Sequence, residues 1–387
     1  MKRATLLIAF LYTFNFIHAQ ESVITTAVPF LLVAADARSA GMGDNGVASS
    51  TDGFSQQWNP SKYAFATDQQ GFSVSYTPYL TDLVNDISLA QLTYYNKYSE
   101  KSAFAASFRY FGLGDIELRQ DFDSQVMTVS PNEFAFDLSY SLKLSEKFSM
   151  AVAGRFINSN LKVATENNDA SSSSSFAVDV AGFYQSEEIA YSDFNGRWRA
   201  GFNFQNMGPK MSYDNDDLNA NFLPANMKLG GGFDFILDEY NKIAVNLEIS
   251  KLMVPTPQNS DLNGDGVITD EEIQQNSDNY QSIGWFPGIF QSFTDAPGGF
   301  SEELKETTYS LGSEYVYQDS FSFRAGYFHE SPDKGAREFF SLGAGFKYSS
   351  VKIDVSYLFS TSKVQNPLEN TLRFSLTFDF GEKYETF

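Results

Sequence analysis

The sequence predicts an all-β protein, a transmembrane antiparallel β-barrel of about 14 strands with an N-terminal plug or hatch region. The clearest sign is residues 371–380, TLRFSLTFDF, where apolar and polar side chains alternate strictly and give one apolar and one polar strand face. The same period recurs through most of the chain, so nearly every strand needs an apolar cover, which lipid supplies to all of them at once. Aromatic residues make up 16% of the chain, which suits aromatic girdles at the two membrane surfaces.

Overall composition conceals this membrane signal and narrows the function classes. The mean hydropathy is only -0.28, because each apolar residue has polar neighbours in a barrel strand. The chain has no cysteine, which excludes disulfides, zinc–thiolate sites and an acylated cysteine anchor. The formal net charge of -21 argues against a nucleic-acid partner.

Residues 1–19 have the pattern of a secretory signal peptide. Lys2 and Arg3 precede an apolar run too short to span a membrane, and a cleavage site follows at Ala19. Residues 20–70 do not alternate and are rich in Ala, Gly, Ser and Asp, so we interpret them as the plug or hatch region. The barrel is then expected over residues 71–387.

The first seven strands are predicted at 71–80, 86–97, 102–119, 133–144, 148–163, 174–186 and 197–212. In the fourth of them, Phe136 and Leu138 are expected to face lipid, while Asp137 faces the lumen. The second strand loses its phase at Gln91, which indicates a β-bulge.

The other seven strands are predicted at 226–237, 241–253, 307–318, 320–330, 338–349, 351–361 and 371–380. Leu247 and Ile353 are expected to face lipid, while Glu248 and Asp354 face the lumen. The even number of strands is the one that bacterial single-chain barrels have.

Short and long connections alternate along the chain, as they do in barrels with turns at one end and loops at the other. The short ones lie near 97–101, 145–147, 238–241, 318–320 and 349–350, and the longer ones near 120–132, 164–173, 213–225, 254–306, 331–337 and 362–370. The connection 187–196 is the exception, because it falls where a short turn is expected but is long. We expect an integral protein of the cell outer membrane, with both termini periplasmic and the long loops, including 254–306, extracellular.

The sharpest local motif lies in the longest loop and matches the calcium-loop pattern D-x-[DN]-x-[DN]-G-x5-E. The predicted Ca²⁺ ligands are Asp261, Asn263, Asp265, the carbonyl of Val267, Thr269 through water, and Glu272 with two oxygens. Gly266 permits the sharp turn in the middle of the loop. Pro255 and Pro257 forbid a helix just upstream, so we expect a lone structural site with an affinity of about millimolar to tenths of millimolar.

A cluster of large apolar residues follows in the same loop, within residues 283–293. The candidate partner-binding residues are Trp285, Phe286, Ile289, Phe290 and Phe293. So much apolar surface in an exposed loop requires a cover. Two interpretations stay open: a gripping surface for a protein partner, or a segment that folds into the barrel mouth or lies on lipid.

The inward faces carry both signs of charge, and we expect opposite charges to pair across the lumen. Inward glycines such as Gly326 are expected to relieve crowding or allow curvature, with room for a plug or ligand as the less favoured alternative. We expect no enzymatic activity, because His329 is the only histidine left after signal removal and no G-x-S-x-G motif occurs.

The region after the signal peptide resembles the PorV/PorQ family of outer-membrane proteins, which are related to the FadL long-chain fatty-acid transporters. The residues that carry the resemblance are Gly41, Gly43, Asp44, Gly46, Asp52, Asn59 and Pro60, within SAGMGDNGVA and the later WNP. The strand pattern agrees with the resemblance, so it covers nearly the whole chain. It implies a PorV-like, FadL-like barrel of the type IX secretion system of Bacteroidetes.

The resemblance also implies a function in protein transport. PorV-like proteins are non-enzymatic and collect secreted cargo proteins at a large translocon barrel, through a C-terminal signal domain on the cargo. They then escort the cargo to the surface-attachment complex. The alternative is a FadL-type channel for long-chain fatty acids or other small hydrophobic solutes, which would need a continuous apolar pocket beside the hatch.

Overall fold

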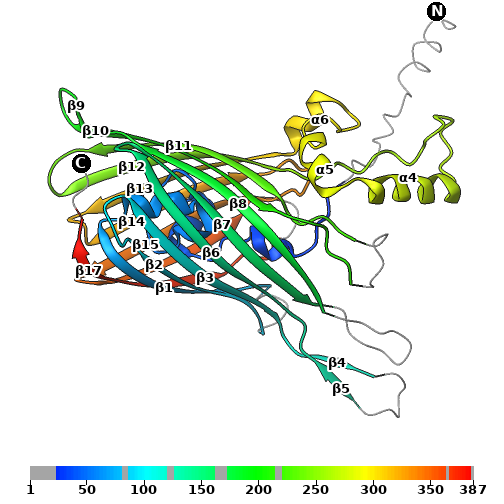
Figure 1. Ribbon diagram of the computed structural model, residues 1–387, viewed down its shortest axis with the longest axis horizontal. Coiled ribbons are helices and arrows are strands. Elements are labelled where there is room, and N and C mark those ends of the chain that lie inside the picture. The colour runs from blue at the N-terminus through cyan, green and yellow to red at the C-terminus, as the bar shows by residue number, and fades with distance from the viewer. Residues whose placement is uncertain are drawn as a thin grey trace, which may run out of the picture.

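Fourteen strands close into one antiparallel barrel (Figure 1). The computed structural model describes residues 23–80, 86–119, 126–161, 172–213, 220–362 and 366–384, so the predicted signal peptide lies outside the described residues. The ring closes because the strand order ends in a β11–β10 pairing, and the first strand pairs with the last. The barrel strands are β1 (Asp68–Pro78), β2 (Ile87–Asn96), β3 (Ser102–Leu113), β6 (Asn132–Ser145), β7 (Phe148–Asn160), β8 (Ser173–Gln185), β10 (Asn195–Met207), β11 (Asn226–Ile236), β12 (Asn241–Leu252), β13 (Thr307–Tyr317), β14 (Phe321–His329), β15 (Glu338–Tyr348), β16 (Val351–Ser360) and β17 (Leu372–Lys383).

The predicted faces of the strands are confirmed. On β6, Phe136 and Leu138 are 42% and 56% exposed, whereas Asp137 between them is fully buried in the lumen. On β12, Leu247 is half exposed and Glu248 is buried. An apolar wall of this kind is stable only against lipid, and the polar positions alternate with it because the side-chain period of a strand is two.

The prediction of a bulge at Gln91 is wrong. β2 pairs in continuous register with β1 and with β3, and Leu89, Gln91 and Thr93 all point inward and are buried. The alternation of apolar and polar residues is interrupted here because Leu89, an apolar residue, lies on the lumen-facing side together with Gln91 and Thr93. It lies in one apolar cluster with Phe30 and Ile157, so the N-terminal segment covers it.

The predicted strand 102–119 is two elements in the structure. β3 ends at Leu113, and Gly114 with a φ of 74° redirects the chain. The short strand β4 (Ile116–Leu118) then pairs with β5 (Met127–Val129) as a separate two-stranded sheet. This hairpin projects beyond the barrel, as Figure 1 shows.

The two ends of the barrel differ as the connection lengths predict. Short turns and the C-terminus lie at one end, called here the turn end, and the long connections lie at the other, the loop end (Figure 1). The long turn 187–196 contains β9 (Ile189–Ala190), which pairs with the start of β10. The connection 187–196 is therefore long because it extends the β8–β10 hairpin beyond the turn end of the barrel.

The longest connection folds into helices that the period of two did not predict. They are α4 (Asp270–Ser282), α5 (Trp285–Gln291) and α6 (Phe300–Lys305), all at the loop end (Figure 1). Within the described residues, none of the helices is both long enough and apolar enough to cross a bilayer. α4 begins at a capping box, in which Thr269 and Glu272 each accept a hydrogen bond from the other's backbone N–H.

The N-terminal segment, residues 23–66, runs inside the barrel (Figure 1). Its short helices are η1 (Pro29–Leu32), α2 (Ala37–Ala40), α3 (Ser55–Trp58) and η2 (Pro60–Phe65), and nearly every residue from 34 to 66 is buried. The barrel strands supply its partners, since α2 contacts β15, β16 and β17 while η2 contacts β3, β6, β7 and β8. The segment therefore occupies the lumen at the level of the strands.

Candidate functional site

The glycine-rich part of the N-terminal segment packs directly on the inner wall of the barrel. A Cβ on Gly43 would lie 2.8 Å from the Tyr327 backbone nitrogen, and one on Gly41 would lie 3.0 Å from the Gly343 Cα atom. Gly43 also has a φ of 76°, which other residues rarely adopt. The motif glycines thus let two backbones approach each other.

Several inward glycines of the wall face this same loop. A Cβ on Gly326 would lie 2.0 Å from the Gly43 nitrogen, and one on Gly312 would lie 2.5 Å from the Met42 carbonyl oxygen. The less favoured interpretation, room for the plug region, therefore describes these positions. Crowding between barrel side chains, the favoured interpretation, applies at Gly345 and Gly232, where an added Cβ would meet Asp354 and Asn246 first.

A buried ionic cluster joins the N-terminal segment to the wall. Arg38 lies 2.6 Å from Asp52 of its own segment and 2.7 Å from Glu314 on β13. Arg324 on β14 lies 2.7 Å from Glu314 and 2.8 Å from Asp354 on β16. Removing one member of such a buried cluster leaves an unpaired charge, which typically costs about 3–5 kcal/mol.

The prediction that inward charges pair holds for most of them. Arg155 pairs with Asp137 and lies 2.9 Å from Asp179. Arg109 differs, because no ion pair to it occurs among the described residues. Its guanidinium donates instead to the carbonyl of Leu31 at 3.0 Å.

The polar motif residues also fix the N-terminal segment. Asn59 donates to the carbonyls of Val47 and Gly182 at 2.9 and 3.0 Å, and Pro60 begins η2 directly after it. Asp44, with a φ of 57°, lies 3.2 Å from Arg373 on β17. Gly46 donates its N–H to Glu248 at 2.8 Å.

Sequence reasoning missed three members of this lumen site. Besides Arg38, they are Asp36, which accepts from the Trp58 indole at 2.7 Å, and Lys62, which donates to the Gly46 carbonyl at 2.9 Å. A usable signal was present, because Arg38 and Lys62 are the only basic residues between 20 and 70, and a buried cation needs an acidic or carbonyl partner.

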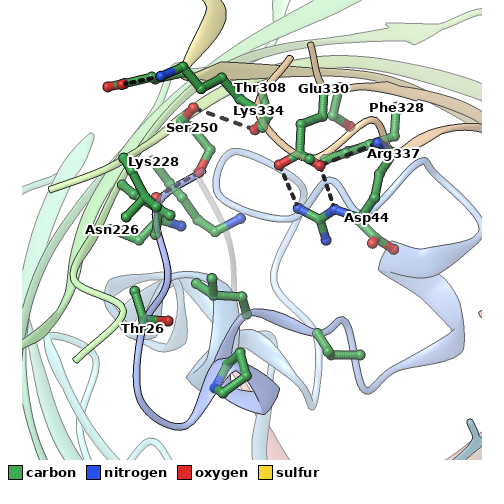
Figure 2. A pocket seen from close by; sticks show the side chains of 18 of the residues that line it. Thr26, Asp44, Asn226, Lys228, Ser250, Thr308, Phe328, Glu330, Lys334 and Arg337 are labelled. Atoms are coloured by element: carbon green, nitrogen blue, oxygen red, sulfur yellow. Dashed lines mark hydrogen bonds and ion pairs between the residues drawn. The ribbon is translucent and has the colours of Figure 1, made fainter. Parts of the chain in front are cut away.

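A cavity of about 440 Å³, here named the loop-end cavity, lies between the N-terminal segment and the loops (Figure 2). Part of its lining is apolar, with Leu32, Val33 and Trp58 from the N-terminal segment and Phe328 from β14. Figure 2 shows Phe328 on the same side as the charged residues of the β14–β15 loop.

Several charged residues that line the loop-end cavity are paired with each other. Arg337 lies 2.8 Å from Glu330, and Lys228 lies 2.7 Å from Glu248 (Figure 2). The cavity thus offers an apolar patch beside polar groups rather than one continuous apolar pocket.

Paired charges also hold α6 across the barrel rim. Glu306 lies 2.7 Å from Lys251 at the end of β12 and 3.2 Å from Lys334 of the β14–β15 loop. Burial alone lowers the pKa of Lys334, but Glu302 and Glu306 outweigh it and raise this pKa above its ordinary value. Glu306 and Lys334 also line the loop-end cavity, so α6 lies at the rim between this cavity and the end of β12.

The predicted calcium loop is folded around its own side chains. Asp261 accepts from the N–H groups of Gly264 and Gly266 at 2.8 and 3.0 Å, and Asp265 accepts from Val267 at 2.8 Å. Glu272 turns back into the loop and accepts from the Asn263 N–H at 3.3 Å. Within the described ranges, no group of three His, Cys, Asp or Glu side chains converges in a geometry ready to hold a metal ion. The oxygen donors suit a hard cation, yet these carboxylates would have to move to bind one.

The aromatic cluster of the loop is split between two environments. Ile289 is buried and Trp285 partly buried, in a cluster with Phe204 and Met227 on outward positions of β10 and β11 and with Met253 just after β12. The other three candidates point away from the barrel, with exposures of 57%, 64% and 39% for Phe286, Phe290 and Phe293. α5 therefore lies on the outer wall at the loop end and leaves an aromatic face uncovered.

A closed barrel with a lipid-facing wall and its N-terminal segment in the lumen defines the class of outer-membrane β-barrel proteins. Residues 16–259 match the family model "Type IX secretion system protein PorV", and this chain belongs to that family. It is therefore an outer-membrane barrel of the type IX secretion system. The comparison with curated proteins gives no match.

One solved structure, with a TM-score of 0.50, shows the same fold, and others are similar with lower scores. The toluene transporter TodX of Pseudomonas putida is similar with a TM-score of 0.50 and 9% identity, over 90% of this chain and 99% of the transporter. The toluene transporter TbuX of Ralstonia pickettii gives 0.49 and 11%, over 91% and 100%. A FadL homologue of Pseudomonas aeruginosa gives 0.43 and 11%, over 93% and 100%. At these identities the likeness concerns the fold alone.

Proposed function

We propose that this protein collects secreted cargo at the large translocon barrel of the type IX system, by binding the cargo's C-terminal signal domain. It then escorts the cargo to the surface-attachment complex. The observation that carries this proposal is the PorV family match, which spans the N-terminal segment and the strands up to β12. The family's role is transport, and the proposal accordingly includes no catalysis.

The filled lumen supports a role at the loop end rather than passage through the barrel. The Arg38 cluster and the glycine contacts leave the N-terminal segment packed against the wall on several sides. We therefore place cargo on the long loops. In this proposal the turn end and both termini face the periplasm, and the loops face the cell exterior.

The exposed aromatic face of α5 is the proposed contact with the translocon barrel. Phe286, Phe290 and Phe293 point outward beside the lipid-facing wall, where another membrane protein would meet this one. Replacing Phe286 and Phe290 by serine should abolish co-purification of a very large barrel protein. The matched control replaces Phe321 and Phe323 on the outer wall of β14 by leucine, which should leave co-purification intact. If the serine variant keeps the partner, the aromatic face touches only lipid.

A deletion strain tests the function as a whole. Loss of the protein should remove secreted proteins from the cell surface and the medium, and should leave growth on long-chain fatty acids unchanged. Reintroducing the intact chain should restore secretion. The opposite pattern, normal secretion with poor growth on fatty acids, would overturn the proposal.

A FadL-type channel for small hydrophobic solutes remains the second candidate, and the loop-end cavity favours it. Leu32, Val33, Trp58 and Phe328 form an apolar patch beside the N-terminal segment, as uptake through a hatch would require. Micromolar binding of a long-chain fatty acid to the purified protein, weakened by Phe328→Asp, would support this alternative. The interrupted apolar lining counts against it.

We also propose that the acidic loop at 261–272 binds Ca²⁺ as a structural staple. Its oxygen donors have the spacing of a calcium loop, and α4 follows directly from Thr269. Calorimetric titration of the full chain should give a dissociation constant of about 0.1–1 mM. Glu272→Gln keeps the capping box but removes a charge, so it should abolish the heat signal. Asp278→Asn on α4 should not, and equal titrations of both variants would refute the proposal.

A further inference from the structure

The connection between β14 and β15, residues 330–337, forms one side of the loop-end cavity and is here named the flap (Figure 2). Its residues Glu330, Lys334, Gly335 and Arg337 line the cavity. The central guanidinium carbon of Arg337 lies 5.2 Å from the centroid of the Phe328 ring, which belongs to the apolar patch of the cavity. The flap therefore covers part of this patch, and its position decides how open the patch is to the loop end.

The flap is a compact unit with its own hydrogen bonds. The N–H groups of Lys334, Gly335 and Ala336 all donate to the carbonyl of Ser331, at 3.0, 3.3 and 3.0 Å. Ala336 has a φ of 60°, which alanine keeps only where its surroundings enforce it. Because these bonds lie within the flap, it can move as one body about the ends of β14 and β15.

Ion pairs fasten the flap to α6. Lys334 pairs with Glu302 of α6 and lies 3.2 Å from Glu306 at the C-terminal end of this helix. All three side chains are buried. A second link, nearer the surface, joins Lys305 of α6 to Asp333 of the flap at 2.9 Å. The shut position of the flap therefore depends on charges that α6 supplies.

α6 is itself attached to the barrel by charges. Lys251 at the end of β12 lies 2.9 Å from Glu303 and 2.7 Å from Glu306. The two large apolar residues of α6 point away from these contacts, with Phe300 81% and Leu304 46% exposed. A segment with few buried apolar contacts opens at a lower free energy than the core of a protein does. α6 is therefore suited to hold the flap reversibly.

We propose that the flap is the gate of the loop-end cavity and that α6 is its catch. The gate is shut while Lys334 is paired with Glu302 and Glu306. When these pairs break, the flap turns about the ends of β14 and β15, and Arg337 moves away from Phe328. The apolar patch then becomes reachable from the loop end. The gate is independent of the cargo function proposed above, because it controls access to the cavity and not what enters it.

The test uses the full chain in detergent and the fact that it contains no cysteine. Val33 lines the cavity and packs against the cluster that contains Phe328, so Val33→Cys places a single thiol behind the gate. The rate of its reaction with the bulky reagent fluorescein maleimide reports how often the gate is open. Adding Lys334→Glu should raise this rate about tenfold or more, since the loss of a buried ion pair shifts an equilibrium by at least that factor. A thiol at the exposed Asp278→Cys on α4 should react at one rate with and without Lys334→Glu.

A charge swap separates an open gate from a loop that has lost its fold. Lys334→Glu combined with Glu302→Lys re-forms an ion pair and should return the Val33→Cys thiol to its slow reaction. The matched control is Lys242→Glu, which breaks an exposed pair with Asp319 at the turn end and should leave the slow reaction unchanged. The proposal fails if Lys334→Glu leaves the rate unchanged, or if the charge swap reacts as fast as Lys334→Glu alone. It also fails if the thiol behind the gate already reacts as fast as the exposed one on α4.

Discussion

At the residue scale, glycine decides where the N-terminal segment meets the barrel. Gly43, Gly326 and Gly312 bring two backbones closer than any side chain would permit. The same contacts place Gly46 and Asp44 within reach of charged wall residues. Packing and ion pairing therefore depend on one another at this loop.

Gly43→Ala should loosen the N-terminal segment. The added Cβ would lie 2.8 Å from the Tyr327 backbone at a strained φ of 76°, which costs about 1–3 kcal/mol for the conformation alone. We expect a lower thermal unfolding temperature and faster proteolysis of residues 23–66. Gly154→Ala is the control, because no atom lies within 4 Å of its Cβ. Identical behaviour of the two variants would contradict the packing described here.

The period of two predicted most residue orientations, because a strand with lipid on one side leaves no choice of face. It failed at Leu89, where an apolar side chain faces the lumen and is covered by Phe30. It also could not assign Arg38, whose partners Asp52 and Glu314 are distant in sequence. Such contacts are set by the closed shape of the barrel rather than by any local pattern.

At the element scale, the longest loop is a folded unit rather than a flexible connection. α6 is fixed by Lys251 and Lys334, and α5 rests on Met253 and Met227. The sequence did contain one sign of α4, since Thr269 and Glu272 form a capping box within the calcium motif. α4 was not predicted, because residues 261–272 were interpreted only as a calcium loop and not also as the start of a helix.

The stability of this loop should depend on pH through Asp295. Burial, together with Glu303 and Glu306 and against a hydrogen bond from Thr256, raises the pKa of Asp295 to about 6. The neutral acid is favoured in the folded loop, so its stabilising contribution is full below the ordinary value of 3.8 and is lost as the pH rises through about 6.

The thermal transition of Trp285 fluorescence should therefore lie higher at pH 5 than at pH 7.5. Asp295→Asn should raise the transition at pH 7.5 and remove most of the difference between the two pH values. Glu271→Gln on the exposed side of α4 serves as the control. A pH dependence that persists unchanged in Asp295→Asn would assign it to other groups.

At the scale of the whole molecule, the barrel is closed in two senses. The β11–β10 pairing completes the ring, and the N-terminal segment fills it. The strand number could be predicted because each strand carries its own signal. The composition of residues 20–70 indicated a plug or hatch region, but its position inside the lumen followed only from the resemblance, since no local pattern shows which groups meet inside a ring.

A filled lumen should not conduct ions. The intact chain in a planar bilayer is expected to remain silent, whereas a variant lacking residues 27–66 should open channels of high conductance. Deleting the β4–β5 hairpin is the control, because this hairpin lies outside the barrel (Figure 1), and that variant should stay silent. Steady conductance of the intact chain would show that ions pass around the N-terminal segment.

The position of α5 and α6 has one further consequence for the surrounding bilayer. Met253 and Lys251 lie under these helices, so the hydrocarbon band on the side of β10 to β13 ends lower than on the opposite side. Acyl chains shorten or the barrel axis tilts to accommodate such unequal heights. Where the acyl chains shorten, we expect a thinner bilayer along this flank, which would ease lateral approach of another protein from that direction.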